Sequence, residues 1–301
     1  MFFQIFVWGN YDSTFCPMRL IWRKLRCQTW VKRSLVSFGF AQDDAKRKSN
    51  FYIQSKIRLM QLLVLLYFFV AIVEIAAEVT GNESLRFLAK PMLMILLISF
   101  YVTSIKGAWN KVHKLMVAAF VFSWIGDVAL MFVGTEGNLM GIPKNPNYFL
   151  AGLGGFLFTH ILYAIAFANV SDKKAVSILT RRPSVLFPLV IYMLALLSIL
   201  VPAIGGNELT KPFLIPVLVY SATIATMVLF AVNRYKRVND KSFALVFGGA
   251  LLFMFSDSLI AINKFIHPFA ISGVLIMVLY ISGQYFIAKG CLAQFNIYAK
   301  N

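Results

Sequence analysis

The chain has 301 residues, of which 59% are hydrophobic and 14% are charged, and its mean hydropathy is +0.75. Soluble domains are close to half apolar and about a quarter charged, so this composition excludes an ordinary soluble protein and indicates a polytopic membrane protein. Lys and Arg number 29 against 12 Asp and Glu, but they lie between apolar runs, where lipid attracts them. The net charge of +17 therefore predicts contact with anionic lipid headgroups and no nucleic-acid partner.

Residues 1–58 differ from the rest of the chain, because they hold 11 Lys and Arg against three Asp. We expect a basic, poorly ordered N-terminal extension, separate from a membrane domain over residues 59–301. The stretch from Arg19 to Arg33 has the pattern of a short interfacial helix that touches anionic headgroups. A start of translation at Met60, where the first apolar run begins, is the alternative explanation for this segment.

Eight apolar runs follow, each long enough for a hydrocarbon core about 30 Å thick, which needs about 20 helical residues. They predict an all-α, polytopic membrane helix bundle with eight transmembrane helices over residues 60–79, 86–105, 114–134, 147–170, 183–205, 211–233, 242–264 and 267–291. Clusters of small residues within the runs predict close helix contacts, as they do in many membrane bundles. The clusters are Gly152, Gly154 and Gly155 in the fourth run and Gly248, Gly249 and Ala250 in the seventh.

The distribution of bases predicts the orientation of the bundle. The connections after the second, fourth and sixth runs carry eleven Lys and Arg, whereas those after the first, third, fifth and seventh carry four. Because basic loops stay in the cytoplasm, we expect a cytoplasmic N-terminus and a cytoplasmic C-terminus, with anionic lipid at the cytoplasmic loops. The expected location is a bacterial plasma membrane, or the endoplasmic reticulum in a eukaryotic cell.

Four of the 12 acidic residues lie inside apolar runs, although loops were available for all of them. Asp127 lies within residues 120–132 and Asp257 within residues 247–262, while Glu74 and Glu78 lie in the first run. An ionised carboxylate is costly to place in hydrocarbon, so a membrane helix seldom carries one without a partner or a task. The polar groups of the other runs include Lys90, Ser123, His160, Tyr163, Ser256, Tyr280 and Gln284.

Each of these groups also has a purely structural explanation. An ion pair of Glu74 and Glu78 with Lys90 would lock the first two helices together, and this explanation and a functional role are equally well supported. His160 by itself fits a hydrogen-bonded core histidine, and Tyr163 fits a packing role. For Asp127 and Asp257 we favour function, because each buried charge raises the cost of folding.

The residue types favour acid/base chemistry on a pair of carboxyls. Metal chemistry fits poorly, since only His160 of the three histidines lies in the interior of a run and the three cysteines form no CxxC pair. No GxSxG pattern supports a serine nucleophile. A carboxyl pair, in contrast, suits a proton donor that desolvation keeps protonated beside a partner that stays ionised. We therefore expect no metal and no cofactor.

Short motifs on successive runs resemble the YhhN-type lysoplasmalogenase family, whose eight-span plan with a cytoplasmic N-terminus also matches. They cover roughly residues 60–292 and are Lys90-Pro91, Gly126-Asp127, Phe156-x-x-x-His160-x-x-Tyr163, the Gly-Ala-x-Leu-Phe-x-x-Ser-Asp segment from Gly249 to Asp257, and Tyr280-x-x-x-Gln284. Thr159 stands where the family pattern has a small residue, and residues 1–58 lie outside the pattern.

The resemblance implies hydrolysis of the vinyl ether bond of lysoplasmalogens to a fatty aldehyde and glycerophosphoethanolamine or glycerophosphocholine. A lysophospholipid in the membrane is then the substrate, and Asp127 and Asp257 are the expected catalytic pair. The expected substrate-binding or supporting residues are Glu78, Lys90, His160, Tyr163, Ser256 and Gln284.

A proton-coupled membrane transporter is the alternative, because a proton relay uses the same intramembrane carboxylates. The two aspartates lie 130 residues and four runs apart in the same predicted orientation, which also suits a duplicated carrier fold. A purely structural membrane partner would leave both aspartates unexplained.

Overall fold

The computed structural model describes residues 17–133, 138–139, 142–143, 145, 147–170 and 174–295, with side chains from residue 47 onward outside the two short strands. The elements are α1 (Pro17–Thr80), α2 (Glu83–Ser104), α3 (Lys111–Met131), β1 (Asn138–Leu139), β2 (Ile142–Pro143), α4 (Tyr148–Ala168), α5 (Ile178–Arg181), the 3-10 turn η1 (Pro183–Leu186), α6 (Phe187–Gly205), the 3-10 turn η2 (Lys211–Phe213), α7 (Leu214–Val232), α8 (Asp240–Phe265) and α9 (Ser272–Phe295). The two strands form one antiparallel pair.

Eight helices among the described residues are long and apolar enough to cross a membrane, which confirms the predicted all-α bundle. They begin and end at 47–80, 83–104, 111–131, 148–168, 183–205, 211–232, 240–265 and 272–295. The chain is therefore an integral membrane protein. Because the number of spans is even, the first span begins and the last span ends on the same side of the membrane. That this side is the cytoplasm stays a prediction.

The first and last spans differ from their predicted limits. No proline interrupts the chain between Pro17 and Pro91, and helix α1 is continuous from Pro17 to Thr80 instead of beginning near Met60. The last span was expected from residue 267 but begins at Ser272. Pro268 explains the delay, because a proline disfavours helical backbone at the residue before it.

The chain forms two compact units, residues 1–57 and residues 58–301. Residues 17–57 of the first unit are helical and belong to α1. We expected the N-terminal extension to be poorly ordered. For residues 1–16 this prediction falls outside the described part of the chain. The second unit holds all eight apolar runs and every candidate site residue.

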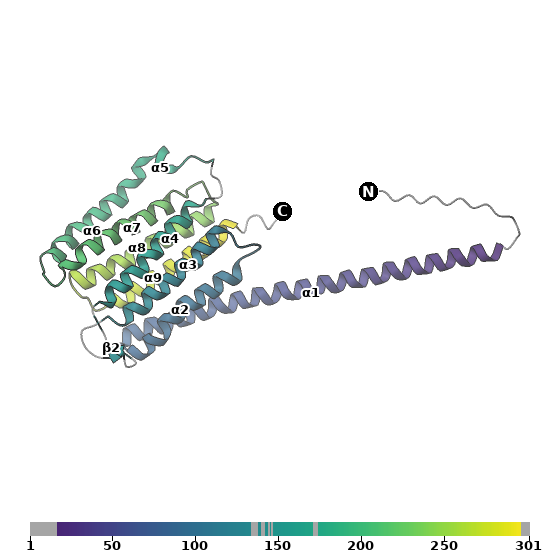
Figure 1. The fold of residues 1–301 in the computed structure, drawn as a ribbon, viewed down its shortest axis with the longest axis horizontal. Helices are drawn as coiled ribbons and strands as arrows, with labels where there is room; N and C mark the ends of the chain where they lie inside the picture. The colour runs from purple at the N-terminus through teal and green to yellow at the C-terminus, as the bar shows by residue number, and fades with distance from the viewer. Residues whose placement is uncertain are drawn as a thin grey trace. The chain divides into compact units, whose positions relative to one another are not determined.

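Within the second unit, helices pack into one bundle (Figure 1). Helix α8 packs along α9, α3 along α4, and α4 also along α7, while α2 contacts α3 and α9. Helix α6 lies at one edge of the bundle, against α7 and α8, and only Leu200 and Ile204 of its 19 residues are buried. The end of α1 joins the bundle where the Tyr67 hydroxyl donates to the Ile281 carbonyl at 2.8 Å.

Asparagines start three of the spans. The side chains of Asn82, Asn110 and Asn239 each accept a hydrogen bond from the backbone N–H three residues later, at 2.8–3.0 Å. Such a cap satisfies one of the N–H groups that a helix leaves free at its start and contributes about 1 kcal/mol. The polar connections thus fix where these helices begin.

Glycines let two helix pairs approach closely. A Cβ atom at Gly155 would lie 2.8 Å from the backbone nitrogen of Gly126, and one at Gly249 would lie 2.7 Å from the carbonyl oxygen of Gly283. Close backbone approach of this kind favours helix association in lipid. Lipid tails are as apolar as the helix surface, so the hydrophobic effect does not drive helices together and close packing does. The predicted small-residue contacts are confirmed at Gly152, Gly155 and Gly249, whereas Gly154 and Gly248 face open space.

The pair Gly155 and Gly154 tests this packing with one substitution at two neighbouring positions. Gly155→Ala should lower the melting temperature in detergent by several degrees, because overpacking against the α3 backbone costs about 1–3 kcal/mol. Gly154→Ala should leave it unchanged or raise it slightly, since alanine favours a helix over glycine by about 1 kcal/mol. Equal melting temperatures for the two variants would contradict the close α3–α4 contact.

Candidate active site

Helices α3 and α9 face each other through two pairs of polar side chains. Ser123 and Asp127 lie four residues apart on α3, and Tyr280 and Gln284 lie four residues apart on α9, so each pair shares one helix face. The Tyr280 hydroxyl donates to Asp127 Oδ2 at 2.5 Å, and Gln284 Nε2 donates to Ser123 Oγ at 2.7 Å. The helices run antiparallel, so the two contacts form a two-step ladder.

The ladder extends into a directed chain of hydrogen bonds. Tyr280 gives its only proton to Asp127, so the Ser123 hydroxyl donates to Tyr280 Oη, at 2.9 Å. At the other end, the Tyr163 hydroxyl of α4 donates to Gln284 Oε1 at 2.5 Å. Every donor in this chain points toward Asp127, which is only 2% exposed. We call these five residues the Asp127 network; its donated hydrogen bonds suit an ionised carboxylate, which is the hypothesis tested below.

Asp257 of α8 belongs to a second set of bonds. His160 Nε2 donates to Asp257 Oδ2 at 2.9 Å, and the Tyr220 hydroxyl of α7 donates to the same oxygen at 2.6 Å. His160 is completely buried, and its Nδ1 atom has no hydrogen-bond partner among the described residues. Both bonds fall on Oδ2, so Oδ1 is the Asp257 oxygen left for another molecule.

Aromatic rings connect the two sets. The Phe253 ring lies 4.7 Å from the His160 ring and 5.4 Å from the Tyr280 ring, measured between centroids. Asp127 and Asp257 lie close enough for their charges to interact, although no hydrogen bond joins them. His160 and Tyr163, three residues apart on α4, each serve one of the two carboxyls. The predicted aspartates thus lie in neighbouring sites that one helix links.

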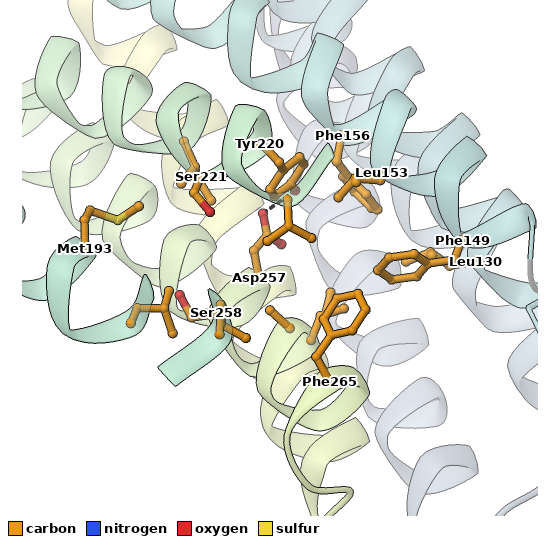
Figure 2. Close-up of a pocket in the computed structure, with 16 residues that line it drawn as sticks. Leu130, Phe149, Leu153, Phe156, Met193, Tyr220, Ser221, Asp257, Ser258 and Phe265 are labelled. Carbon is orange, nitrogen blue, oxygen red and sulfur yellow. Dashed lines mark hydrogen bonds between the residues drawn. The ribbon is translucent and has the colours of Figure 1, made fainter. Parts of the chain in front are cut away.

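A cavity of about 50 Å³ opens beside Asp257, and we call it the apolar cavity (Figure 2). In Figure 2 the carboxyl of Asp257 meets Tyr220 near the centre, with Met193 on one side and Phe149 on the other. Ser221 and Ser258 are the remaining polar residues among the 16 that line it. The cavity has room for water, but a lipid chain would need its walls to part. Asp127 does not line it.

The other predicted residues have different surroundings. Glu78 of α1 pairs with Arg86 Nε at 3.1 Å, so of the two explanations left open by the sequence, an ion pair of Glu78 with Lys90 is not the one observed. Arg86 is nearer because it lies in the first turn of α2, directly after the connection. Ser256 donates to the carbonyl of Ile276 at 3.0 Å and so joins α8 to α9. It does not line the apolar cavity.

Lys90 and Glu74 form no ion pair within 4 Å in the described part of the chain. The Lys90 charge nevertheless interacts with both Glu74 and Asp127. Glu74 is completely buried, and neither of its oxygens has a hydrogen-bond partner among the described residues. In the same residues, no three His, Cys, Asp or Glu side chains group closely enough to hold a metal ion.

The structure adds three residues to the predicted site: Tyr220, Tyr280 and Ser123. Ser123 and Tyr280 were visible as polar groups inside apolar runs, and their four-residue spacings to Asp127 and Gln284 were the available signal. Tyr220 gave no signal, because a tyrosine in an apolar helix is compatible with simple packing. Only the packing of α7 against α8 brings it to Asp257.

In a comparison with protein families, the model of the YhhN family matches residues 85–291 of the chain. The matched range includes Asp127, Asp257 and all their hydrogen-bond partners, whereas Glu74 and Glu78 lie outside it. No solved structure matches the chain.

Removing the hydroxyl that faces Asp127 tests the first network. Tyr280→Phe should lower the free energy of unfolding by about 1.5–3 kcal/mol, because it takes a hydrogen bond from a buried charged group. Tyr192→Phe is the matched control: this phenol donates to the neutral Ser258 hydroxyl at 2.8 Å, and its loss should cost about 1 kcal/mol. Unfolding in mixed micelles would measure both, and equal losses would contradict an ionised Asp127.

Proposed function

The chain belongs to the YhhN family, and from this membership we propose that it is a membrane hydrolase of the lysoplasmalogenase type. The proposed reaction splits the vinyl ether bond of a lysoplasmalogen and yields a fatty aldehyde and a glycerophospho-alcohol. The observation that carries the proposal is Asp257, a carboxyl that lines a mostly apolar cavity and has one oxygen with no hydrogen bond among the described residues.

Asp257 is the proton donor in this proposal. A vinyl ether is cleaved by protonating its β-carbon, which leaves an oxocarbenium ion at the α-carbon. Tyr220 and His160 both donate to Oδ2, so the proposal places the transferable proton on Oδ1. The resulting Asp257 carboxylate takes a proton from water as the water oxygen attacks the α-carbon. The hemiacetal then returns one proton to the ether oxygen and separates into aldehyde and alcohol.

Asp127 has a different role, because it does not line the cavity. Its donors all point toward it and hold its carboxyl in place, and the proposal assigns it the ionised form. A negative charge on Asp127, near Asp257, then stabilises the oxocarbenium ion that protonation of the substrate creates. Asp127 is therefore an electrostatic partner, and His160 and Tyr220 are positioning residues for Asp257.

A lipid substrate fits the edge of the bundle. Met193, Leu196 and Leu200 of α6 line the apolar cavity, and α6 is the least buried of the spans. An alkenyl chain can enter from the lipid if α6 moves aside, without passing through water. The hydrolytic site then lies at the depth where the substrate already resides.

The Asp127 network favours a hydrolase over the alternative, a proton-coupled transporter. A proton relay needs groups that both accept and release protons, and the side-chain amide of Gln284 lies in the middle of this chain of bonds. An amide passes a proton only through a high-energy tautomer. The network suits a fixed charge better than proton flow.

Aldehyde release from lysoplasmenylethanolamine by the purified protein tests the proposal. We expect aldehyde from the unaltered chain, and at least about a hundredfold slower release from Asp257→Asn and Asp127→Asn. Asp240→Asn is the control, since it makes the same change on an exposed residue at the far end of α8. No aldehyde from folded protein, combined with proton-coupled solute uptake in liposomes, would replace the hydrolase with the transporter.

A further inference from the structure

A second, larger cavity adjoins the first, and the residues that line it include the end of α1, the start of α2 and the start of α9. Its volume is about 660 Å³, and we call it the basic cavity. The described residues that line it include three bases and one acid, Arg86, Lys90, Lys264 and Glu78. The start of α9, at Ser272 and Gly273, also lines it, and the Glu78 carboxylate lies against Gly273 there.

Two of the three bases form no ion pair with a described carboxylate. Arg86 is paired with Glu78, so these two charges largely cancel. The ammonium of Lys264 lies 4.6 Å above the centre of the Phe149 ring and makes no ion pair with the described residues. Lys90 likewise has no carboxylate within 4 Å in that part of the chain. The cavity therefore presents two lysine ammonium groups to an anion.

The two cavities share walls. Leu130, Phe149 and Ile260 line both of them. On α8, Asp257, Ile260 and Lys264 follow a three- and four-residue spacing, so they lie on one helix face. Asp257 belongs to the apolar cavity and Lys264 to the basic cavity. Seven residues of helix separate them by about 10 Å along the axis.

We propose that the basic cavity binds the phosphodiester of a lysophospholipid headgroup, with Lys264 and Lys90 contacting its oxygens. This inference rests on the proposed function and specifies how the substrate is placed. Seven covalent bonds join the phosphorus of a lysoplasmalogen to the vinyl ether β-carbon, a span of about 9 Å when extended. That span matches the distance along α8, so a phosphate at Lys264 sets the β-carbon beside Asp257.

The agreement between these two lengths predicts that the two cavities have different roles. The headgroup site determines which lipid binds and how deeply, and the carboxyl site performs the chemistry. A substrate without phosphate, such as a 1-O-alkenylglycerol, keeps the reactive bond but loses the group that Lys264 holds. Lys264 and Lys90 are therefore specificity residues for the phosphate and not catalytic residues.

Equilibrium binding to the purified full chain in detergent tests the site without relying on catalysis. The probe is a radiolabelled 1-O-alkyl lysophosphocholine, whose saturated ether cannot be cleaved by vinyl ether chemistry. Lys264→Met and Lys90→Met should each raise its Kd roughly tenfold or more, as expected for a lost charge-assisted bond. Lys264→Arg should retain most of the affinity, and the exposed Lys211→Met should bind like the unaltered chain.

Two further ligands separate a lipid site from a simple anion site. A 1-O-alkylglycerol, which lacks phosphate, should bind the unaltered chain and Lys264→Met equally well. Inorganic phosphate should displace the lysolipid probe only weakly, because it lacks the chain that fills the apolar cavity. Equal probe affinity in Lys264→Met and the unaltered chain, or complete displacement by phosphate at the concentration of the probe, would overturn the proposal.

The outcomes also separate this inference from the proposed function. Loss of probe binding in Lys264→Met, in a protein that never releases aldehyde, would keep the headgroup site and reject the hydrolase. Aldehyde release with the same KM for lysoplasmenylethanolamine in Lys264→Met and the unaltered chain would keep the hydrolase and reject the headgroup site.

Discussion

Polar side chains inside a bilayer must find their hydrogen-bond partners in the protein, because no water is available and each unsatisfied group costs several kcal/mol. Asp127 and Asp257 both meet this requirement. The donors of each come from other helices: Tyr280 of α9 for Asp127, and His160 of α4 and Tyr220 of α7 for Asp257. The two carboxyls therefore fix how five neighbouring helices are rotated and shifted against one another.

Close helix packing and the hydrogen bonds support each other. Gly126 precedes Asp127 on α3 and touches the backbone of α4 at Gly155, while Gly249 of α8 touches Gly283 of α9, the residue before Gln284. The backbone contacts bring the helices near enough for short polar side chains to meet. A shift of one helix turn would break both kinds of contact together, which makes the arrangement cooperative.

The distribution of polarity along the bundle matches an amphiphile. One cavity holds a single carboxyl among mostly apolar side chains, and its neighbour is lined by lysines of α2 and α8. A phospholipid with one chain has the same order of groups, since an apolar chain, an ether linkage and a phosphate follow one another. Asp257 at the border between the two environments lies where such a linkage would rest.

The sequence by itself determined the membrane class, the eight spans and the residues that carry charge inside them, because burial in lipid leaves a strong signal in composition and run length. Asp127, His160, Asp257 and Gln284 were recognisable for the same reason: polar groups are rare in such runs. The chain pattern also indicated the close contacts at Gly155 and Gly249.

The pairing of those residues was decided only by the tertiary structure. Helix rotation determines that Tyr220 reaches Asp257, that Glu78 pairs with Arg86 instead of Lys90, and that Ser256 faces the α9 backbone. In an apolar run nearly every helix face is equally hydrophobic, so sequence periodicity does not reveal which face turns inward. Packing of the neighbouring helices supplies that information, and with it the partners of each carboxyl.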